Sequence, residues 1–312
     1  MEDFDIRVAR ADDFAEIVDV CSVSLGWENP EFDRALFRWK HEANPFGASL
    51  IMVAATNERI VAVRPFMRWR FRRGSETLSA VRAVDTATRP EARGKGLFRK
   101  LTETGIEVLR EESLGIIFNT PNDQSRPGYL KMGWREAGRI PIGFRLRSIA
   151  EARRLPGARV AAEKLSQHGD FGIDVAAGLA TSERNLGVDT SSQRWATDHD
   201  LATLRWRFTE GPVEYRWLPG PDSTGIIVRV RRRGTAKELF VAATVGQADV
   251  RARAAAVELA WARSNATYCL APVGFPKTIA LKRLGPALTV RSVTREPEPD
   301  LHDWQPGDLE LF

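Results

Sequence analysis

The chain has 312 residues, 43% of them hydrophobic and 28% charged, which is typical of a soluble globular protein with one large domain or two ordinary ones. No apolar run approaches the roughly 18 residues of a membrane span, and the acidic N-terminus lacks the apolar segment of a secretory signal. We therefore expect a cytoplasmic protein without a membrane partner. The net charge of +5 suits a phosphate-bearing ligand but is too small to indicate nucleic acid.

The first half of the chain predicts a mixed α/β sheet. The expected elements are a strand at 5–9, helices at 11–23 and 32–43, strands at 49–55, 59–71 and 76–88, a helix at 98–112, a strand at 115–120, a short helix at 125–132 and a strand at 138–146. A strand, two helices, antiparallel strands and then a strand–helix–strand unit predict a mostly antiparallel α/β (α+β) sheet flanked by helices.

The pattern restarts near Ile149. The expected elements are a helical connector at 149–167, a helix at 197–208, a strand pair at 225–232 and 238–244, a helix at 249–264, a strand at 267–271, a short helix at 276–284 and a strand at 287–293. The remaining tail contains Pro297, Pro299 and Pro306, and we expect it to be a surface extension.

The two halves repeat each other weakly. Residues 33–45 read DRALFRWKHEANP and residues 200–212 read DLATLRWRFTEGP, with Asp, Arg-Trp and Pro at the same spacing. In addition, Lys-Met-Gly at 131–133 and Arg-Leu-Gly at 283–285 each close a predicted short helix before a strand. This order favours two copies of one fold, with domains at 1–148 and 149–312.

A glycine-rich loop, Arg93-Gly94-Lys95-Gly96, connects a predicted strand to a predicted helix. Its two glycines allow a sharp turn and a close approach of the backbone to a ligand. The first free N–H groups of the helix point into this turn, and Arg93, Lys95 and Arg99 add positive charge. The loop therefore predicts a pyrophosphate site, although a simple tight turn has the same pattern. It fits neither a Walker loop nor a dinucleotide fingerprint.

Two motifs in the first half together resemble those of the GNAT superfamily of N-acyltransferases. The family's pyrophosphate motif is Arg/Gln-x-x-Gly-x-Gly/Ala, which Arg93 and Gly96 match, whereas Phe98 stands at its last position. Its following motif is Asn, seven residues on Tyr-x-Lys-x-Gly-Phe, and the matching residues here are Asn122, Tyr129, Lys131 and Gly133, with Trp134 in place of Phe. The resemblance covers residues 5–147 as a fold and about 50 residues as sequence motif.

The resemblance implies that acetyl-CoA is the co-substrate, without a metal, and that it lies between two splayed parallel strands at 81–88 and 115–120. The implied cofactor-binding residues are Thr86, Ala87, Thr88, Arg93, Gly94, Lys95, Gly96, Leu97, Phe98 and Asn122. Tyr129 takes the family's general-acid position, where a phenol with a pKa of about 10 is matched to a departing thiol with a pKa of about 8.5. The alternative for Tyr129 is packing at the edge of the core.

Two further polar positions have more than one interpretation. Asp85 lies in an otherwise apolar and hydroxylated strand, where a carboxylate is costly to bury unless it is hydrogen-bonded. It is either a general base with a raised pKa or a residue tied to Arg82, Thr86 or a backbone turn. Asn119 and Asn122 either contact the cofactor or form an Asx turn around Pro121, which we favour for Asn119.

The second half lacks the residues of the predicted site. Val245-Gly246-Gln247-Ala248 stands where the loop is expected, and Leu281 stands at the position of Tyr129, so we expect one active site and a degenerate second domain.

The predicted function is transfer of an acyl group, most simply acetyl, from acyl-CoA to the primary amine of a small-molecule or peptide acceptor by a monomer or homodimer. One alternative is a tRNA-dependent aminoacyltransferase of the peptidoglycan type, against which the intact loop argues. The other is a non-catalytic CoA-binding regulatory module, against which Tyr129 argues.

Overall fold

The chain folds into two compact units, and each unit is built from three separate segments of the sequence. A computed structural model describes residues 4–57, 59–158, 160–167, 169–182, 193–246, 250–294 and 301–310. Unit 1 comprises Met1–Gly138, Gln193–Trp195 and Ala287–Asp300, and unit 2 comprises Arg139–Ser192, Ala196–Pro286 and Leu301–Phe312. This division differs from the linear boundary expected between residues 148 and 149, because strands near that boundary and near the C-terminus join the sheet of the other half.

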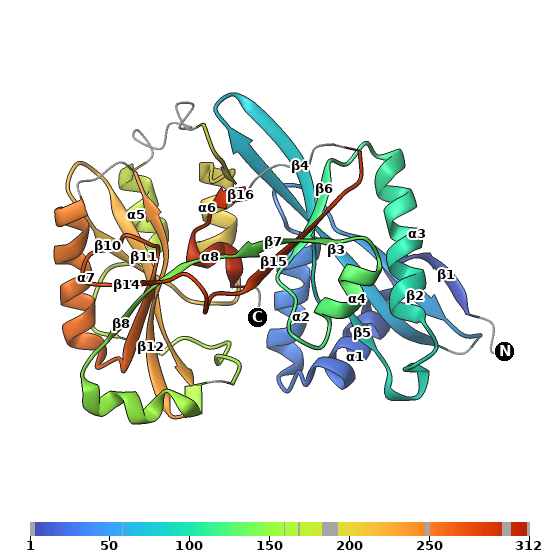
Figure 1. Cartoon of the computed structure of the whole chain (residues 1–312), viewed down its shortest axis with the longest axis horizontal. Helices are drawn as coiled ribbons and strands as arrows, with labels where there is room; N and C mark the ends of the chain where they lie inside the picture. Colours follow the sequence, from blue (N-terminus) through green and yellow to red (C-terminus); the bar gives the residue numbers. More distant parts are fainter. Residues whose placement is uncertain are drawn as a thin grey trace. The chain divides into compact units, whose positions relative to one another are not determined.

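Unit 1 is the mixed α/β sheet with flanking helices that the sequence predicts (Figure 1). Its strands are β1 (Asp5–Val8), β2 (Leu50–Ala55), β3 (Ile60–Arg73), β4 (Glu76–Ala83), β5 (Ala87–Thr88), β6 (Ile116–Asn119), β7 (Arg135–Arg139) and β15 (Ala287–Ser292). Its helices are α1 (Phe14–Leu25), α2 (Pro30–His41), α3 (Leu97–Glu111) and α4 (Arg126–Lys131), with 3-10 turns at Ala11–Asp13 and Pro90–Ala92.

The strands of unit 1 follow the order β1-β2-β3-β4-β6-β15-β7. Strands β1 to β4 pair antiparallel, and β4 pairs parallel with β6 from Ala80–Ile116 to Arg82–Phe118. Among the described residues, no further ladder pair joins these two strands. The chain turns at Asp85, which has a φ of 46°, and continues as β5, which pairs with β3 instead. The two parallel strands therefore separate at the end where the glycine-rich loop follows.

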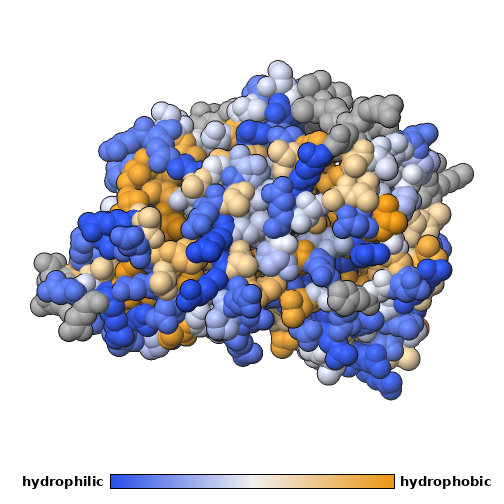
Figure 2. Space-filling view, turned by 180° about the vertical axis from the view of Figure 1, so that it is seen from behind, coloured by the Kyte–Doolittle hydropathy of each residue, from blue (hydrophilic) through white to orange (hydrophobic). Residues whose placement is uncertain are grey.

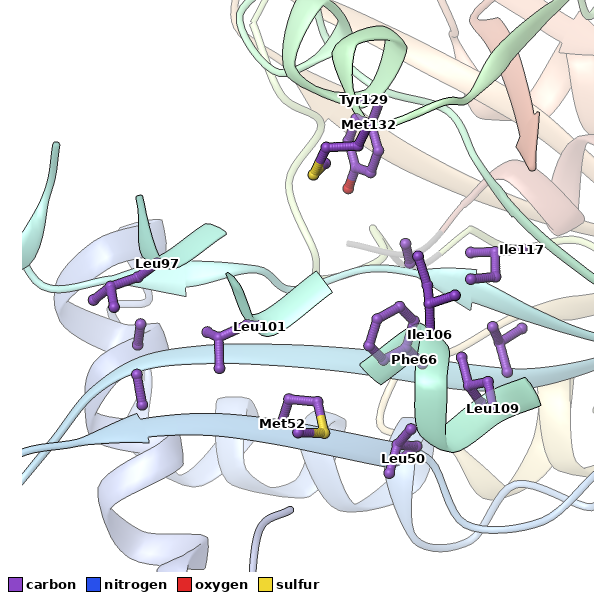
Figure 3. Packing of buried hydrophobic residues seen from close by; sticks show 14 of the residues in the cluster. Leu50, Met52, Phe66, Leu97, Leu101, Ile106, Leu109, Ile117, Tyr129 and Met132 are labelled. Atoms are coloured by element: carbon purple, nitrogen blue, oxygen red, sulfur yellow. The ribbon is translucent and has the colours of Figure 1, made fainter. Parts of the chain in front are cut away.

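Two hydrophobic clusters cover opposite faces of this sheet. One lies between the sheet and helices α3 and α4, and Figure 3 shows its side chains from β2, β3, α3, β6 and α4 meeting there. The other lies under α1 and contains Val18, Phe37 and Val63. Helix α3 approaches β3 closely at Gly105, where a Cβ would lie 2.4 Å from the Phe66 ring. An alanine at this position requires the helix or the ring to move.

Unit 2 contains a sheet in the order β10-β11-β12-β13-β8-β14. Its strands are β8 (Ile142–Leu146), β10 (Arg216–Pro219), β11 (Gly225–Arg233), β12 (Ala236–Val245), β13 (Tyr268–Ala271) and β14 (Ile279–Leu281). The other elements of the second half are 3-10 turns at Ile149–Arg154 and Pro156–Ala158, α5 (Val175–Ser182), β9 (Trp195–Thr197), α6 (Leu201–Arg205), a π-helical turn at Trp206–Glu210, α7 (Val250–Ser264), β16 (Leu301–Asp303) and α8 (Pro306–Leu309).

The two sheets share an order of connections. In each, an antiparallel hairpin (β3–β4 or β11–β12) is followed by a helix (α3 or α7) and a parallel strand (β6 or β13), and an antiparallel strand from a distant part of the sequence lies beside it. That distant strand is β15 in unit 1 and β8 in unit 2. Each half of the sequence therefore completes the sheet of the other unit.

Several sequence-based expectations for the chain beyond residue 137 are wrong. The helix expected at 276–284 is replaced by strand β14, which pairs with β8. The strand expected at 138–146 is two strands, β7 and β8, which belong to different sheets. Pro306 is buried in α8 and is not part of a surface extension, whereas Pro297 and Pro299 lie outside the described residues.

One face of the molecule is largely hydrophilic (Figure 2), and both cysteines are buried. Hydrophilic residues cover much of the face seen in Figure 2, with smaller apolar areas between them. Cys21 and Cys269 are buried free thiols. Within the described ranges, the helices are too short or too polar to cross a membrane.

Candidate functional site

The glycine-rich loop stands where its sequence predicts, between β5 and the N-terminus of α3. Gly94 and Gly96 have φ angles of +75° and +74°, which residues with a Cβ adopt at a cost. No atom lies within 4 Å of a Cβ built on either glycine, so the backbone is open to close approach. The amides of Arg99 and Lys100 both donate to the Gly96 carbonyl, whereas those of Leu97 and Phe98 come too early for a partner in the first helical turn.

Positive side chains surround this helix N-terminus. Arg93, Lys95 and Arg99 are exposed; Lys95 lies over the Phe4 ring at 5.4 Å, and Arg93 Nε donates to the Thr88 carbonyl at 3.3 Å. Together with the helix dipole, the charges of Arg93 and Lys95 suit an anion, whereas Arg99 Nε donates to Glu103 at 2.8 Å.

Tyr129 projects from α4 into the cluster between the sheet and α3. Its side chain is 5% exposed, and Figure 3 shows the phenol directed from the helix toward the strands. Its hydroxyl oxygen accepts a hydrogen bond from Arg64 Nη1 at 2.7 Å. The rings of Phe98 and Trp134 pack edge-on against it, with centroids 5.3 and 5.2 Å away. Tyr129 is thus both part of the core and the acceptor of a polar contact.

Phe98, the departure from the family motif, has a packing partner. A Cβ on Gly128 would lie 3.1 Å from the Phe98 ring, so this glycine makes room for it. The phenylalanine links the first turn of α3 to α4 by its contact with Tyr129.

Arg64 is a site residue that sequence reasoning missed. It lies on β3, has 0% exposure, and its Nη1 donates to Thr86 Oγ1 at 2.5 Å as well as to Tyr129. The signal was a single arginine in the apolar run Ile60–Met67. It joins the chain turn after β4 to the tyrosine on α4.

The pKa of Asp85 is lowered, whereas a general base was expected to have a raised pKa. Its carboxylate forms an ion pair with the buried Lys40 ammonium, and its Oδ2 lies 2.9 Å from His41 Nε2. Burial by itself would raise the pKa of this carboxyl, but Lys40 and His41 outweigh it and hold the pKa at about 2. The partners are therefore residues of α2, not Arg82 or Thr86.

His41 completes this buried group. Its Nδ1 lies 2.9 Å from Ser49 Oγ, so the ring bridges the loop before β2 and the turn after β4. Burial, together with the nearby Lys40 cation, lowers the pKa of His41 despite the Asp85 carboxylate. The imidazole is held neutral by this environment.

The two asparagines have structural partners. Asn122 Oδ1 accepts hydrogen bonds from Ser125 N and Ser125 Oγ, both at 2.9 Å, and so closes the turn that begins α4. Asn119 Oδ1 accepts from Thr289 Oγ1 on β15, which is not the Asx turn favoured for it. Asn122 thus forms a local turn, one of the two interpretations given for it, whereas Asn119 bonds to a neighbouring strand.

The other predicted cofactor positions lie on the backbone path into the loop. Ala87 is buried and pairs with Val63, Thr88 pairs with Ala62, and Leu97 is buried under the first turn of α3. In the described part of the chain, no group of three or more His, Cys, Asp or Glu side chains is arranged to hold a metal ion. A hollow of about 260 Å³, lined by Phe46, Trp69 and Leu114 among others, lies at the opposite end of α3.

Residues 5–137 are similar to a known protein family. The family model described as an acetyltransferase (GNAT) domain matches residues 5–137. No curated protein matches the sequence. The matched residues include the loop, Asp85, Arg64 and Tyr129.

Several solved structures share the fold at low sequence identity. A conserved protein of Enterococcus faecalis V583, described as a probable N-acyltransferase, has a TM-score of 0.67 and 9% identity, and the match covers 94% of this chain and 73% of that one. A GCN5-related N-acetyltransferase of Kribbella flavida has a TM-score of 0.61 and 14% identity, with 94% and 72% covered. One of Anabaena variabilis has a TM-score of 0.60 and 14% identity, with 93% and 73% covered. The shared fold extends beyond residues 5–137 to most of the chain.

Proposed function

Residues 5–137 belong to the GNAT acetyltransferase family, and on this basis we propose that the protein transfers an acyl group, most simply acetyl, from acyl-CoA to a primary amine of a small-molecule or peptide acceptor. The observation that carries this proposal is the placement, in one unit, of an open cationic loop and a tyrosine beside the ends of two separating parallel strands. The loop supplies the cofactor site and the tyrosine supplies the acid.

The loop is proposed to bind the pyrophosphate of CoA. The early amides of α3 point at the anion with the positive end of the helix dipole behind them. Gly94 and Gly96 let the phosphates approach the backbone, and Arg93 and Lys95 contribute positive charge. Thr86, Ala87 and Thr88 lead from the separated strands to this loop, where the pantetheine arm is expected to run.

Tyr129 is proposed to protonate the departing thiolate. The neutral amine attacks the thioester carbon, the C–S bond breaks, and the phenol proton passes to sulfur. The proton lost by the amine goes to solvent, and a solvent proton later restores the phenol.

Asp85 is proposed to position the chain rather than to act as the base. A carboxylate with a pKa near 2 holds a proton poorly at neutral pH. Its bonds to Lys40 and His41 instead hold the positive-φ turn that separates β4 from β5.

Unit 2 is proposed to be a degenerate copy of the same fold. Its hairpin and parallel crossover follow the order seen in unit 1. Leu281, expected at the tyrosine position, lies on strand β14, and Gln247 and Ala248 of the expected loop lie outside the described residues. We therefore propose one active site per chain.

Thiol release from acetyl-CoA across a panel of primary amines tests this function. The panel includes amino sugars, amino acids, polyamines, aminoglycosides and lysine peptides. We expect amine-dependent thiol release with at least one class. Tight CoA binding without turnover on any amine would instead favour a regulatory module, and aminoacyl transfer from charged tRNA would favour the peptidoglycan-type enzyme.

A further inference from the structure

Arg64 is a fully buried cation without a counter-charge among the described residues. None of the ion pairs formed by those residues includes it, and its Nε and Nη2 atoms have no hydrogen-bond partner there. Burying a guanidinium without a carboxylate is costly, so such a residue is retained only where the rest of the fold or the function compensates.

Three aromatic rings and two hydroxyl groups surround the Arg64 guanidinium. The rings of Phe66, Phe98 and Tyr129 lie 5.1 to 5.2 Å from its Cζ atom, and they enclose the guanidinium. Its two hydrogen bonds, from Nη1, go to the hydroxyls of Tyr129 and Thr86. Neutral hydroxyls are weak partners for a buried cation, whereas a phenolate would be a strong one.

A second buried cation of unit 1, Lys40, has different surroundings. Lys40 is also 0% exposed, but it forms an ion pair with Asp85. Unit 1 therefore neutralises Lys40 with a carboxylate and places Arg64 against a tyrosine.

The hydrogen bond from Arg64 also fixes the direction of the phenol proton. Because Arg64 donates into the hydroxyl oxygen, that oxygen acts as an acceptor in this contact and its own hydrogen is free to point elsewhere. A general acid needs this arrangement, with one lone pair held and the proton available.

We propose that Arg64 is a positioning residue for acid catalysis by Tyr129, and that it stabilises the phenolate left after proton transfer. In that step the Tyr129 O–H bond breaks, an S–H bond forms on CoA, and the negative charge on Tyr129 Oη is balanced by the guanidinium. Solvent then returns the proton. This role rests on the proposed function of Tyr129.

A double-mutant cycle tests it, with the panel amine of highest turnover and saturating acetyl-CoA. Arg64→Met is expected to lower kcat roughly 10- to 100-fold, as loss of a hydrogen bond to a charged group does, while the KM for acetyl-CoA changes little. In a Tyr129→Phe background the same change is expected to lower kcat less than about threefold, because no phenolate forms. Arg64→Lys is expected to recover part of the lost turnover.

A matched control is Arg82→Met, which removes another buried arginine of the same sheet that bonds to Thr120 and not to Tyr129. Any loss it causes should be equal in both backgrounds. Equal losses for Arg64→Met in both backgrounds would overturn the role of Arg64 and leave the proposed function standing. Unchanged turnover in Tyr129→Phe, or no thiol release with any amine, would overturn both.

Discussion

The two units differ in the sign of the charged side chain that contacts each of the chain's three tyrosines. In unit 1, Tyr129 accepts a hydrogen bond from a cation, Arg64. In unit 2, Tyr215 and Tyr268 donate to the carboxylates of Glu310 and Glu238 at 2.6 and 2.7 Å. Burial and these carboxylates raise the pKa of both unit 2 phenols, so they retain their protons.

The arginines differ in the same way. On β11, Arg229 Nη1 lies 3.2 Å from Glu310, and Arg231 forms ion pairs with both Glu310 and Glu238. Burial alone would raise the pKa of the Glu310 carboxyl, but the surrounding arginines lower it. The buried charges of Glu310 and Arg231 are neutralised by ion pairs, whereas the Arg64 guanidinium bonds to two neutral hydroxyl groups. This contrast is the one expected if the interior of unit 1 has the proposed catalytic role and that of unit 2 a structural one.

The largest effect is expected on stability when the charge balance of unit 2 is broken. Glu310→Ala removes the buried carboxylate that pairs with Arg229 and Arg231 and should lower the free energy of unfolding by about 3–5 kcal/mol. Arg64→Met should change it by less than about 1.5 kcal/mol in either direction, because the substitution also removes an unneutralised charge. Urea denaturation measures both. Equal losses would remove the contrast between the units.

The next effect concerns the buried pair of unit 1. Asp85→Asn should lower the free energy of unfolding by about 3 kcal/mol, since Lys40 then loses its buried ion pair with this carboxylate. Adding Lys40→Met should restore part of this loss, which a thermodynamic cycle from urea denaturation measures. If the double variant is as unstable as the sum of the single ones, the pair does not hold the turn as described.

A smaller effect is expected for cofactor affinity. Arg93→Ala and Lys95→Ala should each weaken acetyl-CoA binding by about 1 kcal/mol, and the weakening should shrink as salt rises. Isothermal titration calorimetry measures it. Arg110→Ala, an exposed substitution at the other end of α3, is the matched control and should leave the Kd unchanged. Equal weakening by all three would point to a general charge effect rather than a loop site.

The smallest effect is on the pH dependence of stability, and it has opposite signs in the two units. His41 has a lowered pKa, so protonation favours the unfolded state, and its contribution is lost as pH falls below about 6.5. At His199, burial alone would lower the pKa, but Asp308 raises it. Its contribution is therefore present below about 6.5 and is lost as pH rises through the folded pKa.

Thermal unfolding between pH 5 and 8 checks this difference. The stability lost in His41→Asn should shrink as pH falls, whereas that lost in His199→Asn should shrink as pH rises. Parallel pH profiles for the two variants would contradict the assignments.

The sequence predicts those parts of the molecule that depend on local spacing. The turn into α3 and the short helix with Tyr129 follow from glycines and hydrophobic periodicity within a few residues, and both are found where expected. The partners of Asp85 could not be predicted, because Lys40 and His41 lie about 45 residues away and meet it only through packing of α2. Arg64 was missed for the same reason, since its contact with α4 spans 65 residues.

Local sequence patterns also could not predict that β8 joins the sheet of unit 2 and β15 joins the sheet of unit 1. Both segments have ordinary strand patterns, and nothing local states which sheet they join. The burial of Pro306 and Glu310 in the tail depends on partners on β11 and β12, so proline-rich composition was a misleading guide there.

The central claim is that Tyr129 is the acid of an acyl transfer, and the most direct test is Tyr129→Phe. With acetyl-CoA and an active amine, turnover should fall by roughly 10²- to 10⁴-fold. The Kd for acetyl-CoA should stay within about twofold, since the ring packing against Phe98 and Trp134 is retained. An unchanged turnover number would contradict the account and remove Tyr129 from the mechanism.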